Sequence, residues 1–303
     1  MAARSYASGR FALTLGGQTC GFMKSCTPGG LTADVADMPQ ATDNIVKKTV
    51  ANFKWDDWTI SVALGMGHNL YNWMKQALDK SAVPQSGELI IADFDYKAQR
   101  VVEFYDALIT GITFPKCAAE GKEIGYVNLS FSPTRCRTRK GDGSDIRGLI
   151  GPKSKSYATN NFRVDISGLT EECKRVAEVG EMKFESKIAT DHVGIHNEPE
   201  KCYAALSQPD FDIKFSGADN EAWDNLTKGF FVDGARLESN EHTGSIEYLG
   251  PDMKTVLATL SMQNMGLKKM AHGDLAPNDE KMQRMNAVFY VESYHLEIKE
   301  YDA

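Results

Sequence analysis

The sequence predicts a mainly β fold of the α+β class, arranged as two β-sandwich or partial-barrel domains that each carry one amphipathic helix. Short segments in which apolar and polar residues alternate predict strands, and apolar residues at helical spacing predict a helix between two of them. The same order of segments recurs about 150 residues further along the chain, which is typical of a duplicated unit. A chain of 303 residues is long enough for two domains of ordinary size.

The first predicted strand contains Phe11, Leu13 and Leu15, which alternate with polar or small residues and run into a glycine pair at 16–17. This pattern indicates a half-buried strand that ends in a turn. The pattern recurs 151 residues later at Phe162, Val164, Ile166 and Gly168.

The second predicted strand, residues 58–62, has a counterpart 153 residues later at 211–215, and a helix is predicted after each. The apolar residues of both helices lie at i, i+3, i+4, i+7 and i+8, the spacing of one helical face. They are Leu70, Trp73, Met74, Ala77 and Leu78 in the first helix, and Trp223, Leu226, Thr227, Phe230 and Phe231 in the second. Asn69 is expected to cap the first helix, and Asp219 or Asn220 the second.

A hairpin is predicted after each helix. In the first half it consists of a strand at 87–91, a turn at 93–95 and a return strand at 101–112. Its counterpart consists of a strand at 244–248, a turn at 250–252 and a return strand at 255–267. Gly111 and Gly266, 155 residues apart, are expected to be equivalent.

The last predicted strands are 125–131 and 287–298, and the polar segment 272–284 is interpreted as a loop inserted in the second half. Because the spacing between equivalent segments stays between 151 and 157 residues, we favour a duplication over one large, unrepeated α+β domain. The predicted domains are residues 1–140 and 160–303. The link between them, 141–159, is rich in Gly, Ser, Lys and Arg and is expected to be exposed.

Composition and charge narrow the classes of function. A net charge of −7 disfavours a strongly basic surface for sequence-specific nucleic-acid binding. No stretch approaches 18 apolar residues and the first residues lack a secretory apolar core, so we expect no membrane segment and assembly in the cytoplasm. The six cysteines have no metal-site spacing and are expected to be mostly reduced, partly buried thiols. They are Cys20, Cys26, Cys117, Cys136, Cys173 and Cys202.

Asp191, His192 and His196 are the residues that most resemble a metal site, because histidines four residues apart on a helix can bind one ion. Gly194 and Pro199 disfavour a helix there, and no HExxH glutamate accompanies the histidines. Solvated loop histidines are the favoured interpretation. No catalytic, cofactor-binding or metal-binding residue is assigned, and no cofactor is expected.

The basic run Arg135, Arg137, Arg139 and Lys140, followed by the acidic segment 142–145, suggests a phosphate-contacting patch, a subunit-docking loop or a solvated link. Of these, the solvated link is favoured. The glycines at 141 and 143 are too close together for a phosphate-binding loop and lack its GK[ST] ending. Aromatic residues at strand spacing are expected to pack in the core or between subunits rather than to stack on a ligand; these are Trp55, Trp58, Phe289, Tyr290 and Tyr294.

Residues from about 10 to 135 resemble the tail tube protein family of contractile phages and related injection systems. The resemblance depends on the opening RFALTLGG, on NIVKK at 44–48 before the strand at 55–62, and on the helix that contains Trp73. It continues through GELIIADFDYKAQRVVEFYDALITGITFP and EIGYVNLSFSP. The second half is similar through its match to the first, although its polar loop before Phe211 is longer, carries an acidic stretch and lacks the NIVKK segment.

The resemblance implies two tail-tube-like domains in a ring whose sheets join edge to edge around a lumen. Family rings contain six such domains, so three chains would close a pseudo-hexamer, with six chains as the other possibility. Stacking of rings and contacts with sheath and baseplate proteins are implied, as part of a phage tail or injection particle. The alternatives are an adaptor ring between the tube and the baseplate or cap, a ligand-binding β-sandwich module, and a metal hydrolase centred on His192 and His196.

Overall fold

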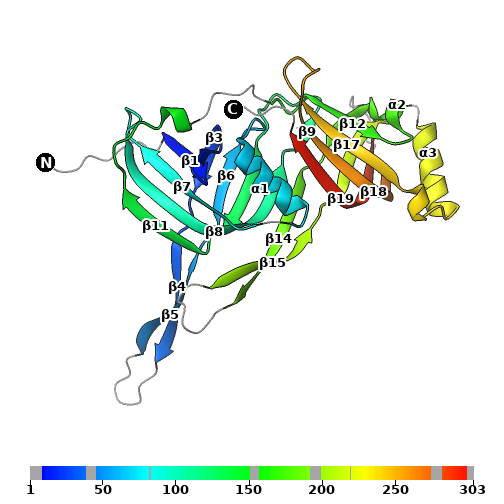
Figure 1. Ribbon diagram of the computed structural model, residues 1–303. Coiled ribbons are helices and arrows are strands. Elements are labelled where there is room, and N and C mark those ends of the chain that lie inside the picture. The colour runs from blue at the N-terminus through cyan, green and yellow to red at the C-terminus, as the bar shows by residue number, and fades with distance from the viewer. Residues whose placement is uncertain are drawn as a thin grey trace.

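The computed structural model describes residues 9–38, 46–81, 83–150, 157–191, 199–218, 220–273 and 282–298. The fold is mainly β, as the alternating segments predict, with curved sheets (Figure 1). The strands of the first half are β1 (Phe11–Leu15), β2 (Gln18–Thr19), β3 (Met23–Thr27), β4 (Leu31–Met38), β5 (Lys47–Trp55), β6 (Trp58–Val62), β7 (Gln85–Ala92), β8 (Ala98–Phe114), β9 (Cys117–Ala118), β10 (Val127–Ser132) and β11 (Arg135–Lys140). Those of the second half are β12 (Phe162–Ile166), β13 (Val176–Val179), β14 (Met182–Asp191), β15 (Glu200–Ser207), β16 (Phe211–Ser216), β17 (His242–Leu249), β18 (Val256–His272) and β19 (Arg284–Ile298).

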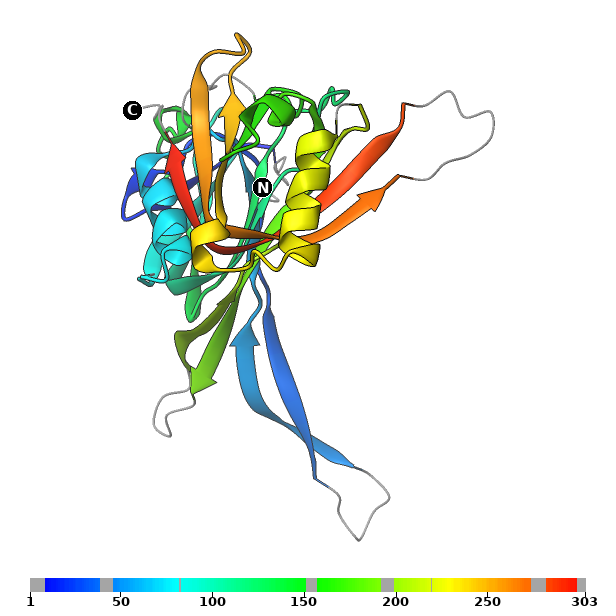
Figure 2. The same ribbon diagram turned by 90° about the vertical axis from the view of Figure 1, so that its right-hand side faces the viewer.

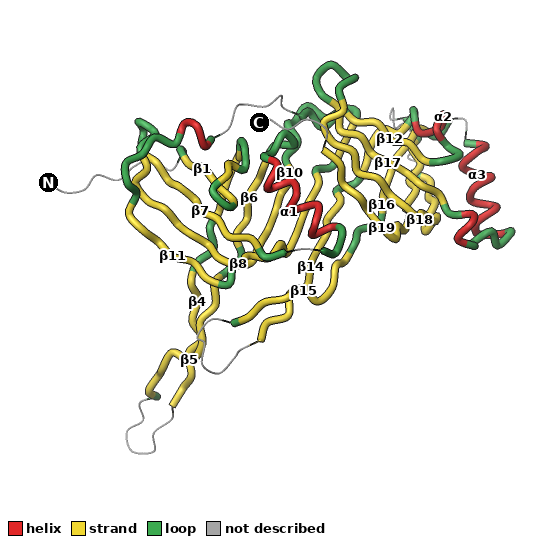
Figure 3. The backbone as a smooth tube through the Cα atoms, in the orientation of Figure 1, coloured by secondary structure: helices red, strands yellow, loops and turns green. Residues whose placement is uncertain are grey.

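Few helices occur in the described part of the chain. The α-helices are α1 (His68–Leu78), α2 (Thr170–Cys173) and α3 (Glu221–Thr227), and a π-helical turn, η2 (Lys228–Val232), continues α3. Two 3₁₀ turns, η1 (Arg147–Leu149) and η3 (Glu238–Asn240), lie in connections. Figure 3 shows how sparsely helix covers the strands.

The two halves form sheets with the same strand order. In the first sheet six neighbouring strands follow the order β1-β7-β8-β10-β6-β3, and in the second the order is β12-β17-β18-β19-β16-β13. The amphipathic helix lies at the same place in both halves, since α1 follows β6 and α3 follows β16. The two sheets lie side by side (Figure 1), and the predicted segments therefore recur as equivalent elements of one architecture.

Irregularities of the backbone also recur at equivalent positions. Asp106 in β8 and Asn264 in β18 both adopt left-handed φ, at 48° and 53°, and each is the ninth residue of its strand. Tyr96 and Met253, in the turns before these strands, have φ of 63° and 56°. Residues other than glycine seldom adopt this conformation. Its occurrence at matching positions in both halves is therefore a more specific similarity between them than the strand order alone.

The expected equivalence of Gly111 and Gly266 is wrong by three residues. Ladder register places Ala107 opposite the first residue of β7 and Met265 opposite the first residue of β17. Each is the tenth residue of its strand, so β8 and β18 match from their first residues onward. Gly111 therefore corresponds to Lys269. Gly266 is a glycine for a different reason, because a Cβ there would come within 2.1 Å of the Tyr290 ring.

The helix starts differ from the capping predictions. The N-cap position of α1 is Gly67 rather than Asn69, whose side-chain amide donates instead to the carbonyl of Leu15 at 3.1 Å. Asn220 occupies the N-cap position of α3, but its amide donates to the carbonyl of Gly217 at 2.6 Å and makes no cap. Asp219 lies outside the described residues. The predicted apolar stripe buries Trp223 and Phe230, whereas Phe231 is exposed because the chain ends the helix as a π turn.

The predicted polar loops before β6 and β16 are hairpins. In the first half β4 and β5 pair with no other described strand and project away from the body (Figure 2). In the second half β14 and β15 form the corresponding hairpin. In each hairpin the two strands pair with each other and so satisfy backbone hydrogen bonds within the hairpin.

The connection between the halves is more buried than its composition predicts. The basic run 135–140 is strand β11, paired along β8, rather than a solvated link. Ile146 is fully buried in a small cluster with Ala12 and Ile90, and Tyr157 is 1% exposed. The segment interpreted as an inserted loop is strand at its ends, since β18 runs to His272 and β19 starts at Arg284, while residues 274–281 lie outside the described residues.

Candidate functional site

The joint between the two halves is an exchange of strands. Residues 182–185 of β14 pair antiparallel with residues 111–114 of β8, with Phe184 opposite Ile112 and Glu185 opposite Gly111. In return, β9 from the first half pairs with the outer edge of β13. Each sheet thus contains strands from the other half, and the open edge of β8 is satisfied by hydrogen bonds from β14.

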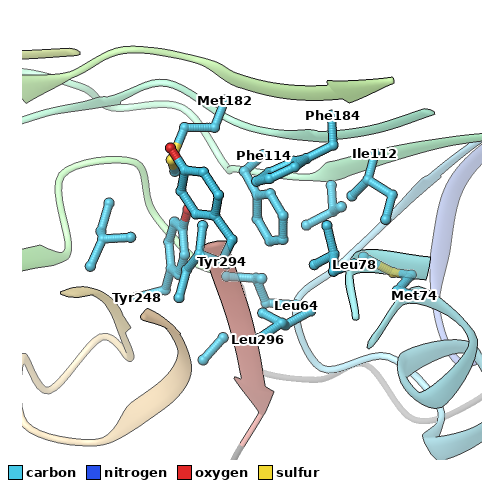
Figure 4. Close-up of a cluster of buried hydrophobic side chains, with 14 of the residues drawn as sticks. Leu64, Met74, Leu78, Ile112, Phe114, Met182, Phe184, Tyr248, Tyr294 and Leu296 are labelled. Carbon is cyan, nitrogen blue, oxygen red and sulfur yellow. The ribbon is translucent and has the colours of Figure 1, made fainter. Parts of the chain in front are cut away.

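Large aromatic side chains fill the space beneath this joint. Phe184 packs edge-on against Phe114 at 6.0 Å between ring centroids and against Tyr294 at 4.9 Å. Phe114 also stacks on Tyr248 at 6.0 Å. These rings come from β8, β14, β17 and β19, and Figure 4 shows them converging with Met182 and Leu296. Because all four rings are at most 3% exposed, the joint has the character of a domain core.

Polar groups fasten the hairpin β14–β15 to the first sheet. The backbone N–H of Ile109 donates to the hydroxyl oxygen of Tyr203 at 2.7 Å. The Lys201 ammonium donates to Ser132 Oγ at 2.9 Å and to the carbonyl of Pro133 at 2.7 Å. Burial lowers the pKa of Lys201, a cost that these two hydrogen bonds offset in part.

Further contacts cross between the halves away from the hairpin. The Tyr71 hydroxyl on α1 donates to the carbonyl of Leu296 in β19 at 3.0 Å. Glu178 on β13 lies 2.9 Å from the ammonium of Lys116 and 2.7 Å from that of Lys214. Burial opposes ionisation of this carboxyl, but hydrogen bonds from the two lysines hold its pKa below the ordinary value.

The hairpin β4–β5 has no such partner among the described strands. Several of its apolar side chains face solvent, with Leu31 55%, Val35 56% and Val50 64% exposed. A strand whose outer edge has no partner and which exposes apolar residues favours pairing with a further strand. This hairpin is therefore the candidate assembly element.

This hairpin was interpreted as a polar loop, although residues 31–35 and 51–55 alternate apolar and polar residues, the pattern of a strand. A second signal was present in the segment lengths. The stretch from Cys26 in β3 to its ladder partner Ile60 in β6 is as long as the stretch from Val179 in β13 to its partner Ile213 in β16. Equal lengths between equivalent strands indicate that the two intervening segments are built alike.

The cysteines are thiols without disulfides among the described residues. Cys20, Cys117, Cys136 and Cys173 are buried, Cys26 is half-buried and Cys202 is exposed, so most of these thiols are more buried than the partly buried ones that were expected. Burial raises the pKa of Cys26, Cys117 and Cys173 to about 12 and that of Cys136 to about 11. Such thiols stay protonated at neutral pH and are poor nucleophiles.

The residues singled out for chemistry do not converge. His192 and His196 lie outside the described residues, and Asp191 is an exposed residue at the end of β14. Within the part of the chain that the structure describes, no three His, Cys, Asp or Glu side chains group as metal ligands. None of the helices described there is long and apolar enough to cross a bilayer.

The basic run is engaged within its own sheet. Arg139 contacts Glu103 at 2.6 Å and Glu88 at 2.8 Å, while the guanidinium groups of Arg135 and Arg137 lie over the Tyr105 ring. Among the predicted packing aromatics, Trp58 and Phe289 are fully buried and Tyr294 is 3% exposed. Trp55 and Tyr290 are half-buried and pack against the same core.

No protein-family model matches this chain, and no curated protein matches its sequence. Several solved structures are similar in fold. The cap of the anti-feeding prophage, AFP, is 17% identical over 46% of this chain and 95% of its own, with a TM-score of 0.42. Two chains of the extracellular contractile injection system PVC are 13% identical over 46% of this chain. The sheath/tube terminator is covered over 99% of its length and a chain of the sheath-tube complex over 94%, both with a TM-score of 0.41.

Proposed function

We propose that this chain is a structural subunit of a ring with a central channel, in the inner tube of a contractile phage tail or contractile injection system. The observation that carries the proposal is the strand exchange between the halves, in which β14 extends the first sheet through β8. A subunit that already joins two like units edge to edge is built to continue the same joint with further copies. The resemblance of residues 10–135 to tail tube proteins supports the same conclusion.

The proposal treats the chain as a tandem duplication with domains at 1–140 and 160–303 and a link at 141–159. Support comes from the shared strand order and from the matched left-handed residues Asp106 and Asn264. Six domains in a ring then need three chains, a pseudo-hexamer. Such rings would stack and contact sheath and baseplate proteins as part of a phage tail or injection particle.

The role is proposed to be structural rather than enzymatic. Trp58 and Phe289 are aromatic residues that could in principle stack on a ligand. Both are fully buried in the core. An adaptor or cap ring that occurs once in the particle is the alternative within the same class. It differs from the tube in that its rings would not stack on one another.

Negative-stain electron microscopy of the purified chain tests the proposal. We expect rings with a central channel, and a native mass of three times the chain mass of 33.4 kDa. Stacks of rings favour the tube and isolated rings favour the adaptor. Six chains in a ring would overturn the pseudo-hexamer, and a monomer at high protein concentration would overturn the ring.

A further inference from the structure

The chain contains two equivalent hairpins, of which one is docked and the other is not. The pairing register shifts once in each hairpin, at a bulge. In β4–β5 the first pair after the bulge is Val35 with Val50, and in β14–β15 it is Ile188 with Tyr203. Aligning the two bulges makes Leu31 of β4 equivalent to Phe184 of β14. Phe184, on the strand that pairs with β8, is 1% exposed, whereas Leu31 is 55% exposed. The equivalent residue is therefore apolar in both hairpins but buried in only one.

The strand that receives the docked hairpin is also present twice. β8 and β18 are both 17 residues long and match from the first residue to the last. Residues 111–114 of β8, which pair with β14, thus correspond to residues 269–272 of β18. On one side these β18 residues pair with β19, but on the other side the pairing with β17 stops at Met265. None of the described strands covers that second edge, and it projects from the body with the first residues of β19 (Figure 2).

The backbone of β4 is oriented for the same kind of pairing. The N–H of Asp56 donates to the carbonyl of Gly30 at 2.9 Å, so the polar backbone groups of Gly30 face β5. Because these groups alternate in direction along a strand, those of Leu31 face the free edge. Leu31 is thus placed to exchange hydrogen bonds with another strand without disturbing the hairpin.

We propose that residues 29–32 of one chain add as an antiparallel strand to residues 269–272 of a second copy. Transferring the register of β14 on β8 places Leu31 opposite Met270 and Thr32 opposite Lys269. This inference rests on the proposed ring function and names its interface. The contact joins different surfaces of the two copies, so repetition gives a ring when the rotation closes. It reproduces between chains the joint that β14 makes within one chain.

A disulfide between neighbouring chains tests the register. Thr32 and Lys269 would form a pair without mutual hydrogen bonds, whose Cα atoms lie about 4.5 Å apart, within reach of a disulfide. The double variant Thr32→Cys/Lys269→Cys, in a Cys202→Ser background, is expected to give a ladder of covalently linked chains under mild oxidation. Each single variant, and Thr32→Cys with Ser261→Cys as a control in the β17-paired part of β18, is expected to stay unlinked.

A proline tests the backbone contribution. Leu31→Pro removes an N–H that faces the free edge and leaves the β4–β5 ladder intact. We expect an association constant at least about tenfold lower than for the matched control Leu31→Val, with unchanged circular dichroism and thermal midpoint. The interface would be overturned, and the ring function would stand, if rings form without the 32–269 disulfide and Leu31→Pro assembles as well as Leu31→Val. A native chain that forms neither rings nor links would overturn both.

Discussion

At the scale of single residues, equivalent positions have different surroundings in the two halves. Phe184 lies between the rings of Phe114 and Tyr294, while Leu31 at the equivalent position faces solvent. Burial of an aromatic side chain contributes several kcal/mol, whereas an exposed apolar side chain contributes little to the stability of an isolated chain. We therefore expect Phe184 to contribute to the folding of the chain and Leu31 to contribute to its assembly.

We expect Phe184→Ala to lower the free energy of unfolding by about 3–5 kcal/mol, because it removes a ring from a filled core. Leu31→Ala is expected to change it by less than about 0.5 kcal/mol, although it weakens ring assembly. Urea unfolding of the unassembled chain, followed by tryptophan fluorescence, measures both. Equal losses in the two variants would show that Leu31 is buried within its own chain.

At the scale of elements, the two hairpins share a register but not a partner. Thr32 lies opposite Lys54 in β4–β5, and Glu185 lies opposite Ser207 in β14–β15. Only the second hairpin carries Tyr203, whose hydroxyl bonds to the backbone of the first sheet. Removal of one hairpin should then affect assembly, and removal of the other should affect folding.

Replacing residues 30–55 by Asn-Gly removes β4–β5 together with residues 30–32 of the proposed interface, and joins Gly29 to Asp56, which lie next to each other. We expect the thermal midpoint to move by no more than about 2 °C while rings disappear. The matched replacement of residues 183–208 removes Phe184 and the Tyr203 and Lys201 contacts and is expected to lower the midpoint by roughly 5 °C or more. Calorimetry and electron microscopy of both variants provide the comparison, which fails if the first variant is the less stable one.

At the scale of the whole molecule, the two sheets share one continuous core. Buried residues of the first half, such as Phe114, belong to the same cluster as Phe184, Tyr248 and Leu296 of the second. Strands also cross in both directions, because β14 joins the first sheet and β9 the second. The halves are alike in architecture but depend on each other for burial of the joint.

Fragments 1–150 and 157–303 are expected to copurify when they are produced together, with a tag on only one of them. Each fragment alone would expose the aromatic joint and an open strand edge, so we expect it to aggregate or unfold. A Phe184→Ala change in the second fragment should weaken copurification. Two fragments that are each soluble, folded and unassociated would contradict the shared core.

Much of the fold was predictable from local patterns. Alternation at Phe11–Leu15 and Trp58–Val62 identified strands, and the stripe from Leu70 to Leu78 identified α1, because these segments face one core on one side. The hairpins were missed because their segments were interpreted as polar loops. Residues 31–35 of β4 do alternate apolar and polar residues, but the strand is exposed along its whole length and packs on no core. Identity of residue type was also a poor guide to register, as Gly266 shows, because a glycine can meet several different steric demands.

The sequence alone determined the order of strands and helices and their recurrence, since these depend on periodicities of two and 3.6 residues that each segment carries by itself. Tertiary structure decided how the halves join. The pairing of β14 with β8, and the free edge left on β18, depend on backbone hydrogen bonds between residues that lie far apart in the chain. Every strand offers such bonds irrespective of its side chains, so only the fold determines which edges are satisfied and which remain open.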